Sequence, residues 1–223
     1  AFSLNTNEIE RCDLPVDQAT FDAQFWQSGP GRPCIFTKLL AATSVDATAV
    51  WSESQKLLGN TEVPVLRPTS GGIARVSMPY TVFVDELLQE ADQLPVAESK
   101  LNSFVAPGVE DPRALYLQLR SLPLADDDDS ASPELLRFAK WLPRPVCLTG
   151  SRKIREMNLW AGRFRTSGLH FDGMDNFLCV LSGSKTVHLY SPRELRRLYP
   201  FPHSAGESTL FKSQVHTSLL PAH

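Results

Sequence analysis

The sequence has 223 residues, 42% of them hydrophobic, so it is long enough to bury a sizeable core. Its formal net charge of -3 excludes a global attraction to nucleic acid or to an anionic membrane, although a local basic patch stays possible. No apolar run approaches the ~18 residues of a membrane span, so we expect no membrane association.

The first half of the chain carries strand and helix signals in mixed order. Residues 32–40 ("RPCIFTKLL") and 62–68 ("EVPVLRP") are short apolar runs bounded by proline, which is typical of strands. Residues 46–60 and 79–94 have apolar residues at helical spacing, with Gly59 as a stop signal and Pro79 as a start signal. We expect the buried faces of these helices to contain Val50, Trp51, Leu57 and Leu58, and Val82, Phe83, Leu87 and Leu88.

A run of four aspartates occupies positions 126–129 and precedes a third predicted helix. The run lacks the spaced ligands and the turn glycine of a calcium loop, so we interpret it as a solvated surface loop. Ser132 and Pro133 then form a helix start signal. The apolar positions of this helix are Leu135, Leu136, Phe138 and Trp141.

From Asn158 onward the pattern changes to short apolar segments separated by Gly, Ser and Asn. The segments cover residues 158–164, 168–172, 176–183 and 185–192, a spacing typical of an all-β sandwich or barrel. We expect residues 1–145 to pack as a helix and strand region on the outside of a β core that begins at residues 146–223. We expect the two parts together to form a single functional domain.

His170 and Asp172 form an H-x-D triplet in one of these predicted strands. Side chains two residues apart in a strand face the same way, so the imidazole and the carboxylate project into one space. This donor pair, with open positions, is the preference of non-haem Fe(II) in a facial triad of two histidines and one carboxylate. The alternative is a histidine that hydrogen-bonds to a surface aspartate.

Lys185 adds a second signal because it shares a strand face with Val187 and Leu189. A lysine in an apolar row is unusual unless it is paired with an anion, and a bound dicarboxylate is such an anion. At a sheet edge the same side chain would simply reach water. Thr166, Ser167 and Asn176 place hydrogen-bonding groups around the triplet, where they can orient a ligand.

These features resemble the JmjC-domain, cupin-fold 2-oxoglutarate oxygenases, particularly the branch of asparaginyl hydroxylases similar to factor inhibiting HIF. The order in residues 159–202 is H-x-D, then Asn, an apolar strand, G-x-K and "LYP"; upstream, "LYLQLRSL" and "RPCIFTKLL" are similar to segments of that branch. The resemblance implies a mainly β fold with flanking helices, a double-stranded β-helix of the jelly-roll or cupin type. It also implies Fe(II) and 2-oxoglutarate as cofactors and O2 as cosubstrate.

Carried over by position, the resemblance makes His170 and Asp172 iron ligands and Lys185 the partner of the distal 2-oxoglutarate carboxylate. Tyr116 and Asn176 line the same pocket, and Ser167 falls where the branch often has threonine. Gln118 faces the substrate side. A tyrosine such as Tyr116 in an apolar run is otherwise typical of a core.

The third iron ligand of the family, a histidine on a late strand, has no counterpart here. His216 and His223 follow His170 too closely, and residues 211–223 resemble the segment that precedes the late strands. We therefore interpret both histidines as loop residues. We expect the missing C-terminal strands and ligand to lie beyond His223, in a longer parent protein.

The implied reaction is hydroxylation of a protein side chain, with succinate and carbon dioxide as co-products. Alternatives are an oxygenase that modifies tRNA or demethylates histones, and an inactive cupin module that binds partners; a protein partner is favoured and RNA stays open. The cysteines form no C-x-x-C, and we expect reduced core thiols, typical of the cytosol or nucleus. They are Cys12, Cys34, Cys147 and Cys179.

Overall fold

The computed structural model describes residues 9–13, 17–26, 33–38, 45–70, 72–93, 115–124, 131–144, 154–162, 167–202 and 212–214. The chain forms two compact units, one of residues 1–61 and 119–159 and the other of residues 62–118 and 160–223. Both units take chain from either side of residue 145, and the single functional domain expected from the sequence stays a prediction. Within the described ranges, no helix has the length and apolar character needed to cross a membrane.

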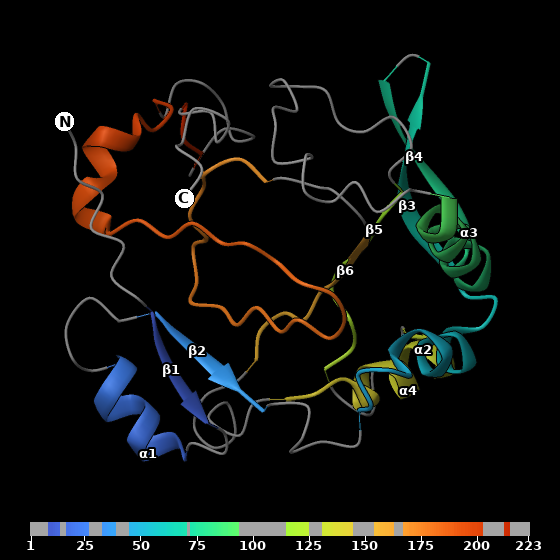
Figure 1. Ribbon diagram of the computed structural model, residues 1–223, viewed down its shortest axis with the longest axis horizontal. Coiled ribbons are helices and arrows are strands. Elements are labelled where there is room, and N and C mark those ends of the chain that lie inside the picture. The colour runs from blue at the N-terminus through green and yellow to red at the C-terminus, as the bar shows by residue number, and fades with distance from the viewer. Residues whose placement is uncertain are drawn as a thin grey trace. The chain divides into compact units, whose positions relative to one another are not determined.

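The first unit contains a parallel pair of strands, β1 (Glu10–Asp13) and β2 (Cys34–Thr37) (Figure 1). Between them the chain forms α1 (Gln18–Phe21), which continues as the π-helical turn η1 (Asp22–Trp26). The Asp17 side chain caps α1 by accepting a hydrogen bond from the Thr20 amide at 2.9 Å, which satisfies one of the free N–H groups of the first turn. The rings of Phe21, Phe25 and Phe36 pack together at centroid distances of 5.6–5.8 Å.

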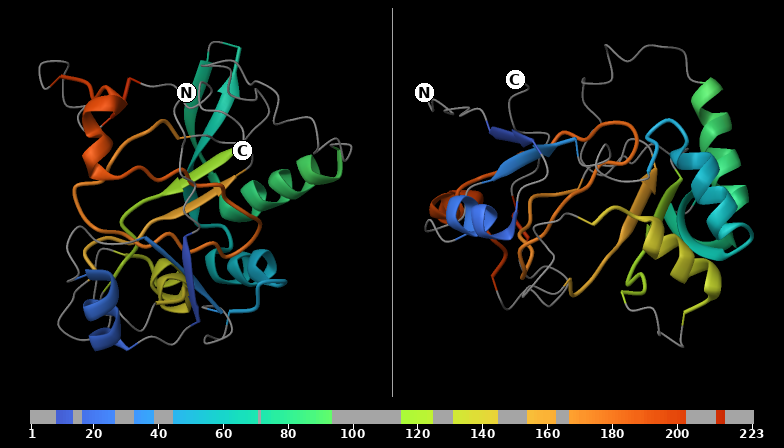
Figure 2. Two further views of the ribbon diagram at one scale, coloured as in Figure 1. Left: turned by 60° about the vertical axis from the view of Figure 1, so that its left-hand side comes forward. Right: turned by 90° about the horizontal axis from the view of Figure 1, so that it is seen from below.

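The helices α2 (Val50–Leu58) and α4 (Pro133–Trp141) of this unit pack against each other (Figure 2). Both confirm the helices expected from the apolar spacing. The α2 helix ends at Gly59, whose φ of 51° suits glycine, and α4 begins after Ser132, whose hydroxyl accepts from the Leu135 amide at 3.3 Å.

The second unit is built on a four-stranded sheet with the order β4-β3-β5-β6 (Figure 1). Its strands are β3 (Glu62–Thr69), β4 (Gly72–Pro79), β5 (Tyr116–Leu119) and β6 (Leu159–Gly162). The β3 strand is antiparallel to both β4 and β5. The helix α3 (Tyr80–Gln93) packs against β3 and β4, and Val63, Val65 and Leu117 are fully buried.

The expected buried face of α3 is wrong in part. Phe83 and Leu87 are buried as expected, but Val82 and Leu88 are 41% and 40% exposed. Residues four positions apart lie on one helix face, so Phe83 and Leu87 turn together toward the sheet, and Val84 joins them. Val82 and Leu88 lie to either side of this stripe.

The late segments also differ from expectation. Residues 176–183 and 185–190 form no strand in the described structure, and residues 168–172 contribute only an isolated bridge between His170 and Lys212. A strand requires a neighbour for its ladder of hydrogen bonds, and the described residues provide none beside these segments. Pro192–Leu198 form a 3-10 helix, η4. The sheets and few helices agree with a mainly β fold, and the double-stranded β-helix stays a prediction.

Candidate functional site

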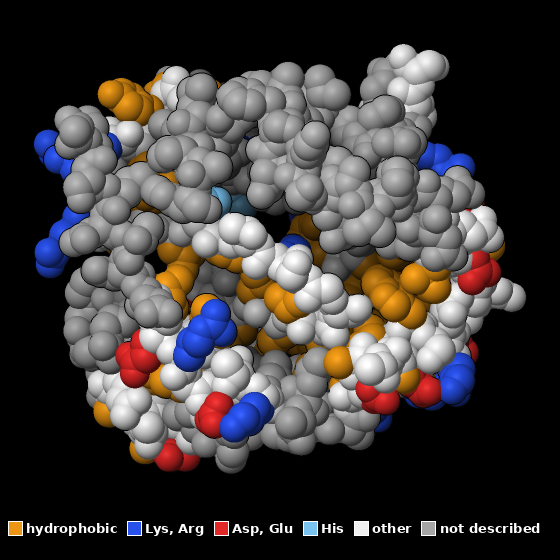
Figure 3. Space-filling model, in the orientation of Figure 1, with side chains coloured by type: hydrophobic (Ala, Val, Ile, Leu, Met, Phe, Trp, Pro, Cys, Tyr) orange, Lys and Arg blue, Asp and Glu red, His pale blue; other side chains and the backbone are white. Residues whose placement is uncertain are grey.

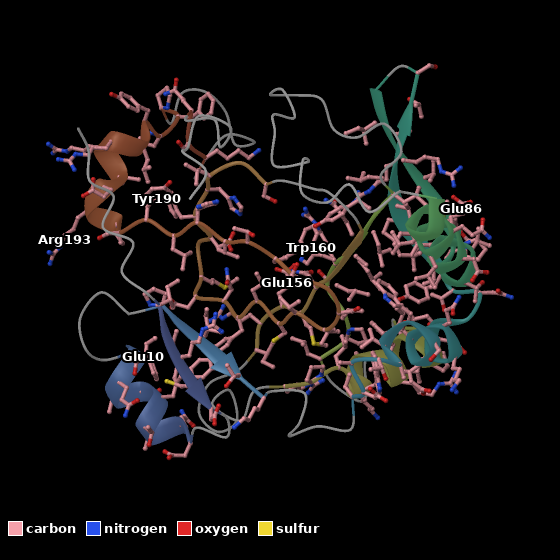
Figure 4. All side chains as sticks on the ribbon, viewed as in Figure 1. Glu10, Glu86, Glu156, Trp160, Tyr190 and Arg193 are labelled. Carbon is pink, nitrogen blue, oxygen red and sulfur yellow. The ribbon has the colours of Figure 1, made fainter. Side chains whose placement is uncertain are left out.

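The sheet of the second unit has a more open face, opposite its buried one. In β5 the side chains alternate, so that Leu117 and Leu119 are buried while Tyr116 and Gln118 are half-buried on the other side. The Tyr116 ring lies 6.1 Å from the ring of Trp160 on β6, centroid to centroid (Figure 4). Tyr116 and Gln118, two of the expected pocket residues, therefore share one face of the sheet.

Gly162 on β6 allows the chain to approach β5 closely. A Cβ atom at this position would lie 2.5 Å from the Leu115 carbonyl oxygen and 2.6 Å from Tyr116 Cδ2, and the φ of Gly162 is +154°. Only glycine fits such an approach without displacing its neighbours. A side chain at position 162 would therefore collide with the Tyr116 ring.

The His170 ring is oriented by the backbone two residues earlier. Its Nδ1 lies 2.8 Å from the Gly168 carbonyl oxygen. A carbonyl can only accept, so Nδ1 carries the proton and donates, and in the neutral ring Nε2 keeps its lone pair. Metal-binding histidines are commonly held in this way. The backbone beside the ring is also anchored, because the Ser213 amide donates to the Leu169 carbonyl at 2.8 Å.

Asp172 lies beside the free nitrogen of His170. Its Oδ1 is 3.7 Å from His170 Nε2, and its Oδ2 accepts a hydrogen bond from the Asn176 side-chain amide. Metal bonds to such donors are ~2.0–2.2 Å long, so two donors less than ~4 Å apart can share one ion. The donor set and its spacing thus fit a divalent metal ion, and Asn176 orients the carboxylate. The same distance suits an ion pair if His170 is protonated.

Both side chains of this pair are accessible, with 46% of His170 and 54% of Asp172 exposed. Among the described residues, no third His, Cys, Asp or Glu completes a metal-binding group with them. His216 and His223 lie outside the described residues, as does Thr166. The pair therefore offers two protein donors, and positions on a bound ion would remain for further ligands.

Lys185 lies in the segment after Gly183, which belongs to no strand of the described structure. It is exposed and makes no hydrogen bond or ion pair with another described residue. Val187 and Leu189, which the alternation places on the same face as Lys185, are 50% and 56% exposed, so this face lacks a covering layer. The exposure of Lys185 therefore does not decide whether its side chain faces a cavity or the protein surface. The role of Lys185 stays a prediction. Ser167 is likewise exposed.

Several structural contacts of the site were not expected from the sequence. The Gly168 carbonyl, Trp160 and the Lys212–Ser213 backbone each support a predicted site residue. Every residue has a backbone carbonyl, so the residue types do not show which carbonyl accepts a hydrogen bond. The pairing of His170 with Lys212 joins residues more than 40 positions apart, and no local sequence pattern predicts it. Apolar side chains also lie open at the surface (Figure 3), and Phe171, Met174 and Leu178 are 49–54% exposed.

Comparison with known proteins gives one family match. A family model described as the cupin-like domain matches residues 21–221. No solved structure matches the chain.

Three similar proteins carry names related to the JmjC domain. Lysine-specific demethylase JMJ31 from Arabidopsis thaliana is 27% identical over 157 residues, which cover 67% of this chain and 28% of that protein. JmjC domain-containing protein D from Dictyostelium discoideum is 46% identical over 46 residues, covering 20% of this chain and 10% of that protein. Putative JmjC domain-containing protein L887 from Acanthamoeba polyphaga mimivirus is 40% identical over 48 residues, which cover 21% of this chain and 8% of that protein. The matches thus span less than a third of each relative.

Proposed function

Because this chain belongs to the cupin-like domain family, with JmjC proteins among its relatives, we propose that it forms part of an Fe(II)- and 2-oxoglutarate-dependent oxygenase that hydroxylates a protein side chain. The observation that carries the proposal is the His170 and Asp172 pair. Its donor atoms lie 3.7 Å apart, and each side chain has a hydrogen bond that fixes its orientation.

In this proposal His170 Nε2 and Asp172 Oδ1 hold the iron. Asn176 donates a hydrogen bond to Asp172 Oδ2, which would leave Oδ1 available to the metal, and the Gly168 carbonyl keeps the proton on His170 Nδ1. The bound metal would supply the oxygen chemistry that couples decarboxylation of 2-oxoglutarate to oxidation of a C–H bond. A facial triad requires a third protein ligand, which we place outside the described residues.

The open sheet face would provide the organic part of the pocket. Tyr116 has a phenol that can donate to a carboxylate, and its ring is held by Trp160 and by the close approach of Gly162. Gln118 lies on the same face and is our proposed substrate contact. Ser167 adds a hydroxyl next to Gly168. A protein partner and a cytosolic or nuclear compartment are proposed from the sequence alone.

A second candidate function is lysine demethylation, favoured by the similarity to a protein named as a lysine-specific demethylase. Both reactions hydroxylate a carbon atom, and they differ in the substrate that reaches the metal. Fold alone does not decide between them.

The function is tested with the full-length protein, Fe(II) and 2-oxoglutarate. We expect succinate to form faster when a pool of peptides is added than when an RNA pool is added. Mass spectrometry of the peptides should show the gain of one oxygen; loss of a methylene group would favour demethylation. Absence of succinate with either pool, from folded protein that retains partners in pull-down experiments, would favour an inactive binding module.

Lys185→Ala tests the cosubstrate. If Lys185 pairs with the distal carboxylate, its removal leaves that charge unpaired, which costs ~2–5 kcal/mol. We therefore expect the apparent dissociation constant of 2-oxoglutarate to rise at least ~10-fold while the affinity for Fe(II) changes little. Titration of 2-oxoglutarate measures this, with Lys56→Ala as a matched surface lysine. Equal dissociation constants of 2-oxoglutarate for the wild type and Lys185→Ala would mean that Lys185 is an ordinary surface residue that does not bind the cosubstrate.

A further inference from the structure

The first unit brings together two cysteines that are far apart in sequence. In the parallel ladder Glu10 lies opposite Cys34, and Cys12 lies opposite Phe36. Partners in register share a sheet face, so Cys12 and Cys34 are diagonal neighbours on one face. Both thiol side chains therefore project to the same side of the strand pair.

The surroundings of the two thiols differ from those of a sealed core. Both cysteines are free and half-buried, so small solutes can reach them. Phe36, on the same face, packs against Phe21 and Phe25, so apolar rings lie on one side of the two cysteines. At the rim, Cys12 Sγ donates to Glu10 Oε1 at 3.8 Å. Figure 4 places Glu10 at the start of β1.

The two thiols are chemically unequal. Burial, together with the hydrogen bond from Cys12 and the nearby charge of Glu10, raises the pKa of Cys34 to about 12. Cys34 therefore stays protonated near neutral pH. Since the thiolate is the reactive nucleophile, the first attack on an oxidant is left to Cys12.

We propose that Cys12 and Cys34 form a peroxide-sensitive pair that closes into a disulfide between β1 and β2. In the first step Cys12 sulfur attacks the O–O bond of a peroxide, giving Cys12 sulfenic acid and releasing water from hydrogen peroxide. In the second step Cys34 sulfur attacks the sulfenic sulfur, the S–O bond breaks, and a second water leaves with the Cys34 proton. The two thiols lose two electrons in total, and the peroxide takes both.

The disulfide would link β1 to β2 and close the loop between them. Cys12 and Cys34 are 22 residues apart in sequence (34 minus 12), and the enclosed chain contains α1 and η1. At the other end of the strands the Lys38 ammonium already pairs with Asp13 at 2.6 Å. A cross-link that closes a loop of this length restricts the unfolded chain and so favours the folded one.

The test treats the reduced full-length protein with hydrogen peroxide, blocks the remaining thiols with a maleimide and maps peptides without reduction. We expect a linked peptide pair that contains Cys12 and Cys34, with loss of both thiols and full recovery by dithiothreitol. The oxidised protein should have a melting temperature about 5–10 °C above that of the reduced protein. Oxidation of Cys12 to sulfinic acid while Cys34 stays alkylated would overturn the proposal, as would resistance of both thiols to peroxide.

Variants separate this pair from other thiol chemistry. Cys12→Ser should leave Cys34 unoxidised, whereas Cys34→Ser should trap Cys12 as a sulfenic acid detectable with dimedone. The matched control Cys179→Ser should retain the cross-link and the shift in melting temperature. Mapping of the wild type does not depend on whether these variants fold. A linked peptide that joins Cys179 to Cys12 or Cys34 as often as it joins the proposed pair would overturn the assignment.

Discussion

His170→Ala and Asp172→Ala are each expected to reduce 2-oxoglutarate turnover by more than ~100-fold. Loss of groups that merely orient a metal ligand costs 10–100-fold in affinity or activity, and loss of a ligand itself costs more. Each variant would leave a single described donor, because the pair at 3.7 Å supplies two. Succinate formation and the Fe(II) dissociation constant are measured on the same preparations of full-length protein.

The matched control is Asp175→Ala, which removes an exposed carboxylate three residues after Asp172. It should bind Fe(II) and turn over like the wild type. Asn176→Ala should have an intermediate effect and reduce Fe(II) affinity and turnover by about 10-fold. It frees Asp172 Oδ2 from its hydrogen bond without removing a metal donor. If His170→Ala or Asp172→Ala keeps wild-type affinity for Fe(II), the pair is an ordinary surface contact and the metal assignment fails.

Gly162→Ala is expected to destabilise the protein by about 3 kcal/mol. The new Cβ would lie 2.5 Å from the Leu115 carbonyl oxygen, and this backbone atom has no side-chain freedom to move away. Overpacking of this kind costs ~1–3 kcal/mol, and a non-glycine residue at the unusual φ of +154° adds a similar amount. Chemical denaturation measures the change in the free energy of unfolding.

Gly173→Ala serves as the control because no atom lies within 4 Å of the Cβ that it would add. It should change the free energy of unfolding by less than about 0.5 kcal/mol. Gly162→Ala should also weaken 2-oxoglutarate binding, since the same Cβ would push against the Tyr116 ring. A variant with wild-type stability would mean that β5 and β6 separate easily, and that Tyr116 is not fixed by this contact.

Local patterns predicted much of the fold of the first half. The α2 and α4 helices follow their apolar spacing and end signals; β2 lies within its proline-bounded run, and β3 covers its own run and extends it by one residue. The strand β1 was missed because "ERCD" alternates weakly, and β4 was missed because "GIARVSMP" carries few apolar residues on its open face. Those strands owe their formation to pairing with β2 and β3, which single-chain patterns do not contain.

The site divides in the same way. The closeness of His170 and Asp172 follows from their spacing in an extended chain, so the sequence was sufficient to place them together. The position of Lys185 depends on a neighbouring strand, and the described residues provide none next to residues 184–190. The placement of Cys12 and Cys34 on one face of the strand pair arises from the register of β1 and β2, so counting cysteine spacings could not reveal it.

The pairing of β5 with β3 also determines how the chain can tolerate insertions and deletions. In the observed register Tyr116 lies opposite Leu66 and Leu117 opposite Val65. Slipping β5 by one residue would turn Tyr116 and Gln118 into the buried face and expose Leu117 and Leu119, because side chains alternate. A single-residue insertion in β5 would thus empty the proposed pocket of its polar groups without removing any of them. Insertion of two residues would preserve the alternation, so length changes in this strand should be accepted only in even steps.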